Sequence, residues 1–150
     1  MTEKCDVLVL GATGMLGNTV LRYFDSRAEY SVKGTNRGSS IPKGLSAVAH
    51  LMIGGVDTEN HDSLVQLISK YRPSVVVNCV GLVKQLDASE DPLKCMPINS
   101  LLPHRLFQLC SSIHARLVHI STDCVFDGER GMYKETDWPN ARDLYGRSSC

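Results

Sequence analysis

Three evenly spaced glycines between a strand pattern and a helix pattern constrain the fold of this chain most. Residues 7–10, Val-Leu-Val-Leu, form a continuous aliphatic run, which is typical of a strand buried on both faces. Beyond the glycines, apolar residues recur at helical spacing, at Leu16, Val20, Tyr23 and Phe24. A buried strand, a glycine turn and an amphipathic helix in direct succession predict the first unit of an α/β sheet.

The turn itself, Gly11-Ala12-Thr13-Gly14-Met15-Leu16-Gly17, has the properties of a diphosphate-binding segment. Gly11 permits a tight turn, Gly14 lets a diphosphate approach the backbone, and Gly17 lets the helix pack closely on the strand. The helix N-terminus adds unpaired N–H groups and the positive end of its dipole. We therefore expect residues 11–17, Thr13, Met15 and Leu16 included, to bind a dinucleotide. The alternative is that the glycines serve only the turn.

The residues after the second predicted strand indicate which nicotinamide dinucleotide would bind. About 20 residues past the turn, an acidic residue favours NAD and an arginine favours NADP. The sequence there is Thr35-Asn36-Arg37, without a carboxylate. Arg37 can form a charge-assisted pair with a 2′-phosphate. The expected cofactor is therefore NADPH, with NADH left open, and the alternative for Arg37 is a solvated loop residue.

Strand and helix patterns alternate along the rest of the chain. We expect further strands over residues 30–35, 47–53, 75–81 and 117–120. One helix is expected where Leu64, Leu67, Ile68 and Tyr71 recur, capped by Asn60 or Asp62 and stopped before Pro73. Another is expected around Leu102, where Pro103 would kink or delay it. Residues 84–94 are a long polar stretch, with a solvated loop expected over 84–91. A surface loop is expected over 127–143, and a last helix begins near Leu144. The alternation predicts one domain over residues 1–150, a doubly wound parallel sheet of order 3-2-1-4-5.

Composition excludes several classes of function. The chain has 16 basic and 16 acidic residues, so no net charge attracts it to nucleic acid or to an anionic membrane. No apolar run is long enough to span a bilayer, and residues 1–5 lack a signal-peptide pattern, so we expect a cytoplasmic protein. The six cysteines and five histidines have no metal-ligand spacing. We expect reduced thiols and no metal.

The G-x-x-G-x-x-G spacing resembles the extended short-chain dehydrogenase/reductase superfamily. Asp57 matches the acidic residue that contacts the adenine in that superfamily. Asn78-Cys79-Val80-Gly81 ends a strand in the way such enzymes end one beside the cofactor, and Asn99 matches a helix asparagine that supports the active-site lysine. The resemblance thus implies cofactor contacts from Asn36, Asp57, Asn78, Val80, Gly81 and Asn99.

A second segment is more specific. Ser121-Thr122-Asp123-Cys124-Val125-Phe126-Asp127-Gly128, followed by Leu144-Tyr145-Gly146, resembles the dTDP-4-dehydrorhamnose reductase family and its sugar-nucleotide relatives, with Cys124 in place of the usual aromatic residue. The resemblance implies hydride transfer from NADPH to the ketone of a nucleotide sugar. Thr122 would hydrogen-bond the carbonyl oxygen, whose developing negative charge needs donors, and Tyr145 would donate the proton.

The sequence departs from this family at the lysine expected four residues after Tyr145. Position 149 is serine, and Arg147 cannot replace the lysine because residues two apart point to different sides of a helix. The chain then ends at Cys150, which we interpret as a fragment or a frameshifted product. This form is expected to reduce its substrate weakly or not at all. The fifth strand would form an uncovered sheet edge that could pair with a second copy of the chain, so a homodimer is one of the expected possibilities.

Other functions fit parts of the same pattern. An epimerase or dehydratase of the superfamily would share the cofactor turn. A non-catalytic nucleotide-binding regulator, like the regulatory beta subunit of methionine adenosyltransferase, would explain the loss of the lysine, although Thr122 and Tyr145 are both present. The simplest alternative is a Rossmann-like fragment that binds no ligand.

Overall fold

The computed structural model describes residues 5–149 and contains a parallel five-stranded sheet of order β3-β2-β1-β4-β5. The strands are β1 (Val7–Leu10), β2 (Val32–Thr35), β3 (Met52–Ile53), β4 (Val75–Asn78) and β5 (Arg116–His119). Both the α/β class and the strand order confirm the prediction from the sequence. The expectations that concerned Met1 to Lys4 and Cys150 lie outside the described residues.

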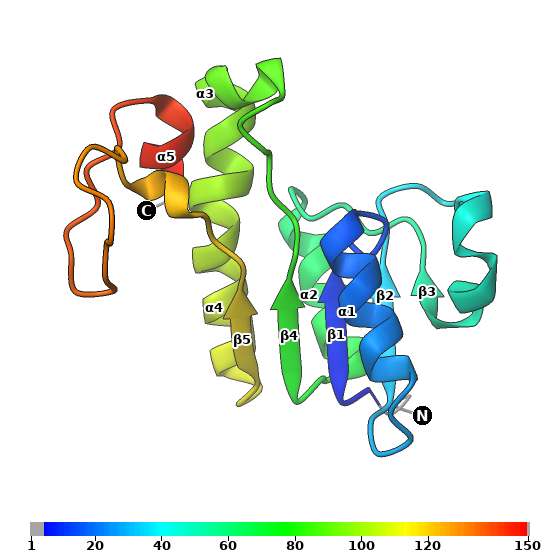
Figure 1. The fold of residues 1–150 in the computed structure, drawn as a ribbon. Helices are drawn as coiled ribbons and strands as arrows, with labels where there is room; N and C mark the ends of the chain where they lie inside the picture. Colours follow the sequence, from blue (N-terminus) through cyan, green and yellow to red (C-terminus); the bar gives the residue numbers. More distant parts are fainter. Residues whose placement is uncertain (1–4, 150) are drawn as a thin grey trace. The chain divides into compact units, whose positions relative to one another are not determined.

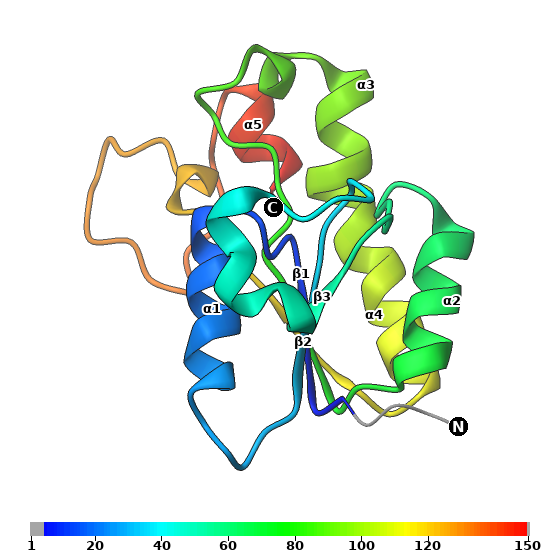
Figure 2. The ribbon, with the colours of Figure 1, turned by 90° about the vertical axis from the view of Figure 1, so that its right-hand side faces the viewer.

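The chain divides into two compact units. Of the described residues, the first unit comprises 5–80 and 103–120 and contains the sheet, and the second unit comprises 81–102 and 121–149. In the first unit, α1 (Met15–Asp25) lies on one face of the sheet (Figures 1 and 2). Helices α2 (His61–Tyr71) and α4 (Leu102–Ser112) cover the opposite face. The assignment of residues 1–150 to one domain stays a prediction.

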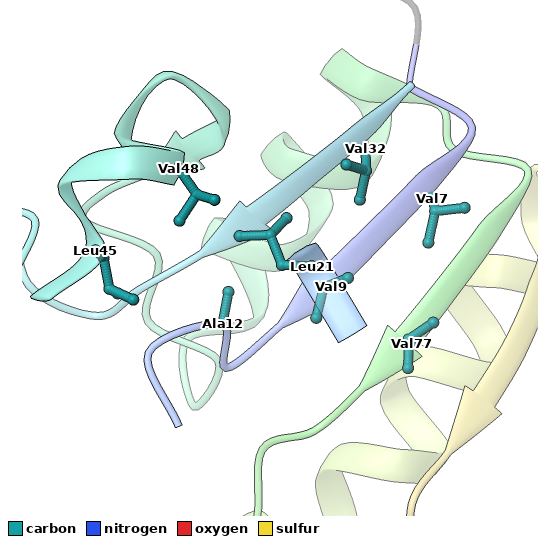
Figure 3. Packing of buried hydrophobic residues seen from close by; sticks show 8 residues of the cluster. All are labelled: Val7, Val9, Ala12, Leu21, Val32, Leu45, Val48 and Val77. Atoms are coloured by element: carbon teal, nitrogen blue, oxygen red, sulfur yellow. The ribbon is translucent and has the colours of Figure 1, made fainter. Parts of the chain in front are cut away.

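The core of the first unit has apolar residues buried on both faces of the sheet, and one cluster forms where α1 packs on it. Strand β1 is central, with Val7 paired to Val32 of β2 and to Val75 of β4. Every residue of β1 is buried, which explains its unbroken aliphatic sequence. The cluster on the α1 side, drawn in Figure 3, consists of Val7, Val9, Ala12, Leu21, Val32, Leu45, Val48 and Val77.

The third strand is shorter than the sequence indicates. We expected a strand over residues 47–53, but a 3₁₀ helix, η1 (Lys43–Leu51), precedes a strand of only Met52–Ile53. Leu45 and Val48 are three residues apart and both buried, so the helical spacing places them on one face in the core. A short apolar run fits a strand and a buried helix equally well, and here the helix forms.

Helix α2 begins and ends as the sequence indicates. The side chain of Asn60 accepts a hydrogen bond from the Ser63 backbone N–H, with 3.2 Å between oxygen and nitrogen. Asn60, one of the two caps considered, is therefore the N-cap. At the other end, Arg72 adopts the left-handed conformation with φ of 40°, and the helix stops before Pro73.

The second unit contains only short helices. They are η2 (Asp87–Glu90), α3 (Pro92–Cys95), the π-helical η3 (Met96–Leu101), η4 (Asp123–Val125) and α5 (Leu144–Ser148). The loop expected over residues 84–91 contains the short η2, and α3 begins directly after it. Asp91 caps α3 by accepting from the Leu93 N–H, and Pro92 occupies the first turn, where its missing N–H costs nothing. The loop over residues 127–143 and the helix from Leu144 are confirmed.

Two absences concern residues 5–149 alone. No helix in this part of the chain has both the length and the apolar character needed to cross a bilayer. Of the cysteines described there, Cys79, Cys95, Cys110 and Cys124 are free thiols.

Candidate functional site

The glycine turn connects β1 to α1 through a backbone that only glycine tolerates at two positions. Gly11 has φ of +75°, in the left-handed region. A Cβ on Gly17 would lie well under 3.0 Å from the carbonyl group of Gly11. A Cβ on Gly14 would meet the Gly11 oxygen at 3.5 Å, an ordinary contact, so Gly14 leaves space rather than relieving a clash. The turn thus forms a cradle in which a ligand can approach the protein backbone closely.

The N-terminus of α1 is open to an anion. Gly14 is the N-cap, no side chain caps the helix, and no acidic residue lies in its first turn. Thr13, Met15 and Leu16 are exposed around it, Met15 by 90%. The N–H groups of the first turn therefore have no competing carboxylate, which is the condition for binding a phosphate there.

The carboxyl edge of the sheet gathers the predicted cofactor residues of the first unit. The Ala12 N–H donates to Thr35 O at 3.0 Å, and the Asn36 N–H donates to Ile53 O at 3.0 Å. The Cys79 N–H donates to Leu10 O at 3.1 Å. These backbone bonds bring the turn, the segment after β2 and the end of β4 together, as expected for parallel strands whose ends share one edge.

Asn36 and Arg37 lie directly after β2. The buried Asn36 amide donates through Nδ2 to Gly38 O at 2.6 Å and to Ser40 O at 3.1 Å. Its Oδ1 is buried without a hydrogen-bond partner, an acceptor that suits a hydroxyl or amino donor of a ligand. Arg37 is exposed, and its Nη2 lies 3.7 Å from Asp57 Oδ2 and 3.4 Å from Glu59 Oε2.

The end of β4 is fixed by Asn78, which is fully buried. Its Oδ1 accepts from the Val80 N–H at 3.1 Å, and its Nδ2 lies 3.0 Å from Nδ1 of His119 on β5. Burial lowers the pKa of His119 from its usual value. Val80 is also close to the turn, because a Cβ on Gly11 would lie 3.0 Å from its Cγ2.

In the second unit, Asn99 fixes the segment that follows Gly81. Its Oδ1 accepts from the Leu82 N–H at 2.9 Å, and its Nδ2 donates to Leu82 O at 3.1 Å. Asn99 belongs to the π-helical η3, a helix type that often marks functional sites. Among the described residues, its side chain thus serves the backbone at Leu82.

Thr122 and Tyr145 also lie in the second unit. Thr122 Oγ1 accepts from the Cys124 N–H at 3.2 Å and caps η4, while Tyr145 lies in the first turn of α5. Gly146 brings α5 onto η4, since a Cβ there would lie well under 3.0 Å from Cys124 O. The two predicted catalytic residues are therefore on elements in direct contact.

Lys84 is a charged residue near Tyr145 that the sequence did not single out. Its Nζ lies 2.6 Å from Oδ2 of Asp143, the N-cap of α5. The hydrogen bond and charge of Asp143 raise the pKa of Lys84, and the Lys84 hydrogen bond is the main cause that lowers the pKa of Asp143. A pocket of 530 Å³ opens beside this pair, lined by Lys84, Asp123, Cys124, Phe126, Asp127, Gly128, Gly131 and Tyr133.

Position 149, where the family places lysine, has a different role here. Ser149 Oγ donates to Tyr145 O at 3.0 Å, and Ser149 O accepts from Ser121 Oγ at 3.0 Å. A serine hydroxyl has no charge with which to tune Tyr145. The helix end is held by neutral hydrogen bonds where a cation is expected.

The structure therefore collects the predicted residues in two groups. The first unit contains the turn, Asn36, Arg37, Asp57, Asn78 and Val80, and the second contains Gly81, Asn99, Thr122 and Tyr145. Sequence reasoning missed Asn18 of α1, whose buried Nδ2 lacks a partner, and it missed Glu59 and Lys84. Within residues 5–149, no three His, Cys, Asp or Glu side chains are grouped to hold a metal.

Comparisons with known proteins show the family to which this chain is similar. The sequence profile of the RmlD substrate binding domain family matches residues 5–150. A dTDP-4-dehydrorhamnose reductase from Streptomyces griseus is 31% identical over 140 residues, which is 93% of this chain and 40% of that protein. Methionine adenosyltransferase 2 subunit beta from Bos taurus is 29% identical over 142 residues, 95% of this chain and 40% of that protein.

A solved structure is similar over nearly the whole chain. The crystal structure of dTDP-4-dehydrorhamnose reductase from Bacillus anthracis in complex with NADP superposes with a TM-score of 0.76 and 26% identity. The match covers 99% of this chain and 47% of that chain. The chain thus spans less than half the length of each of these three relatives.

Proposed function

This chain belongs to the RmlD substrate-binding domain family, and from this we propose that it forms the cofactor-binding part of a nucleotide-sugar reductase of the dTDP-4-dehydrorhamnose reductase type. The observation that supports it most is the glycine cradle of residues 11–17 in front of an uncapped helix N-terminus. A diphosphate needs both the close backbone approach and the free N–H groups. The expected cofactor is NADPH, with NADH as the weaker ligand.

The first unit would bind and orient the cofactor. The turn would hold the diphosphate, Arg37 the 2′-phosphate and Asp57 the adenine, while the free Oδ1 of Asn36 offers an acceptor close to Arg37. Asn78 and Val80 would line the end of β4 beside the nicotinamide. When bound, the cofactor supplies hydride to a ketone carbon.

The second unit would handle the carbonyl oxygen and the proton. The Thr122 oxygen accepts from the Cys124 N–H, and its hydroxyl donates to Asp123 Oδ1 over a long 3.5 Å. That hydroxyl would turn from Asp123 to donate to the substrate oxygen as negative charge develops there. Tyr145 would then give up its phenolic proton to that oxygen. A neighbouring cation would assist this proton transfer, and Ser149 offers no charge beside Tyr145.

The test measures binding and turnover separately in the 150-residue chain. We expect it to bind NADPH more tightly than NADH and to oxidise NADPH only slowly with a 4-keto nucleotide sugar. The variant Ser149→Lys should speed this oxidation without a matching change in NADPH affinity, and Ser149→Ala is the uncharged control. Absence of binding to both dinucleotides would contradict the proposal.

A second candidate function is a non-catalytic nucleotide-binding regulator. The specific observation in its favour is Ser149, which removes the lysine while the predicted cofactor residues stay in place. This reading predicts that NADPH binds but that neither the chain nor Ser149→Lys oxidises it with any keto sugar nucleotide. Turnover by Ser149→Lys separates the two candidates.

A further inference from the structure

Arg37, the residue expected to meet a 2′-phosphate, already faces two carboxylates in the first unit. Its Nη2 lies 3.4 Å from Glu59 Oε2 and 3.7 Å from Asp57 Oδ2. The side chain of Arg37 is 72% exposed, so water screens both pairs and neither holds the guanidinium tightly. Any anion that binds Arg37 must therefore compete with these carboxylates.

The two carboxylates differ in what else they do. Asp57 accepts a hydrogen bond from the Glu59 N–H at 3.1 Å, and under the proposed function it also contacts the adenine. Among the residues that the structure describes, Arg37 is the only cation within ion-pair distance of the Glu59 carboxylate. Glu59 is thus the carboxylate that can act at this site through its ion pair with Arg37, whereas Asp57 has a second role.

The backbone of Glu59 is held in place on both sides. Its N–H is bonded to Asp57 Oδ1, and its carbonyl oxygen accepts from Nη1 of Arg105 on α4 at 3.3 Å. With the backbone fixed and the side chain only 35% exposed, the carboxylate stays close to Arg37. A 2′-phosphate at Arg37 would meet this negative charge at short range.

The geometry points to Glu59 as a specificity-determining residue that limits the preference for NADPH over NADH by competing with the 2′-phosphate for Arg37. The inference rests on the proposed function, since it concerns the same cofactor site. A phosphate dianion pairs with a guanidinium more strongly than a carboxylate does, so NADPH still binds. NADH has no 2′-phosphate and leaves the Arg37–Glu59 pair intact.

The test compares dissociation constants for NADPH and NADH by titration calorimetry. Glu59→Gln should tighten NADPH binding about two- to fivefold, the range set by an exposed ion pair, and change NADH binding by less than about twofold. In an Arg37→Gln background, Glu59→Gln should leave the ratio of the two constants unchanged. Glu29→Gln is the matched control, because it removes the same charge from an exposed residue at the opposite end of β2.

Each outcome decides one of the two proposals. If wild type binds both dinucleotides and Glu59→Gln leaves their ratio unchanged, the role of Glu59 is wrong while the proposed function stands. An equal change with Glu29→Gln would also overturn it, because overall charge would then be the cause. NADH affinity serves as the check that each variant is folded. If wild type binds neither dinucleotide, the proposed function fails, and the role of Glu59 with it.

Discussion

Asn78 donates a hydrogen bond through Nδ2 to Nδ1 of His119, joining the ends of β4 and β5. The orientation of the amide is fixed, because Asn78 Oδ1 accepts from the Val80 N–H. Nδ1 of His119 must then be the acceptor, which requires a neutral ring. Burial lowers the pKa of His119 in the same direction. The end of β4 therefore depends on an unprotonated histidine.

This relationship predicts a loss of stability in mild acid. The folded pKa of His119 is below the unfolded value of about 6.5, so the unfolded chain takes up the proton more readily. The contribution to the free energy of unfolding is present above that value and is lost as pH falls through it toward the folded pKa. Denaturant unfolding between about pH 7.5 and 5 should show the decline, and His119→Gln should reduce it. The exposed His104, replaced by Gln, is the control; equal slopes for wild type and His119→Gln would contradict the assignment.

The glycine turn predicts different outcomes at two of its positions. Gly17→Ala should lower the free energy of unfolding by about 1–3 kcal/mol, because the new Cβ overlaps the Gly11 carbonyl. Gly14→Ala should lower it by no more than about 1 kcal/mol, the loss of a glycine N-cap, since its Cβ has room. It should nevertheless weaken dinucleotide binding by blocking the diphosphate. Chemical denaturation and NADPH titration of both variants provide the measurement. If Gly14→Ala bound NADPH as tightly as wild type, the turn would not be part of the dinucleotide site.

The contact between α5 and η4 predicts a third effect. Gly146→Ala places a Cβ against Cys124 O and the Ala141 side chain, so α5 must shift and move Tyr145 with it. We expect reduced hydrogen-exchange protection in residues 144–149 and a loss of unfolding free energy of about 1–3 kcal/mol. Gly44→Ala is the control, because nothing lies within 4 Å of its added Cβ. Unchanged protection in Gly146→Ala would show that the contact is not required.

Elements with strong periodicity were predictable from the sequence, and short ones were not. Strand β1 is a continuous run of buried residues, and the buried residues of helix α2 recur at helical spacing. The position of each element follows from its pattern. The segment before β3 has apolar residues that suit a strand or a helix, and only its packing against the sheet selects η1. The start of α3 did have a local signal, Asp91-Pro92, which the polar composition of residues 84–94 concealed.

The candidate site was predictable where its residues are consecutive and not where they meet through the fold. The turn over residues 11–17 contains its own geometry. The approach of Glu59 to Arg37 depends on the pairing of β2 with β3, which places residues 22 positions apart along the chain side by side. The pair of Lys84 with Asp143 spans 59 positions, and no local sequence pattern connects the two residues.

The left-handed conformation of Arg72 at the end of α2 identifies a position where a substitution should stabilise the protein. A residue with a Cβ has a cost of about 1–2 kcal/mol in this conformation, whereas glycine has none. Arg72→Gly should therefore raise the free energy of unfolding by about 1 kcal/mol after the greater chain entropy of glycine is deducted, and a thermal melt would measure it. A melting temperature at or below that of wild type would contradict this. Arg72 precedes β4 and the glycine turn follows β1, so the change lies at the opposite end of the parallel strands and leaves dinucleotide affinity as it was.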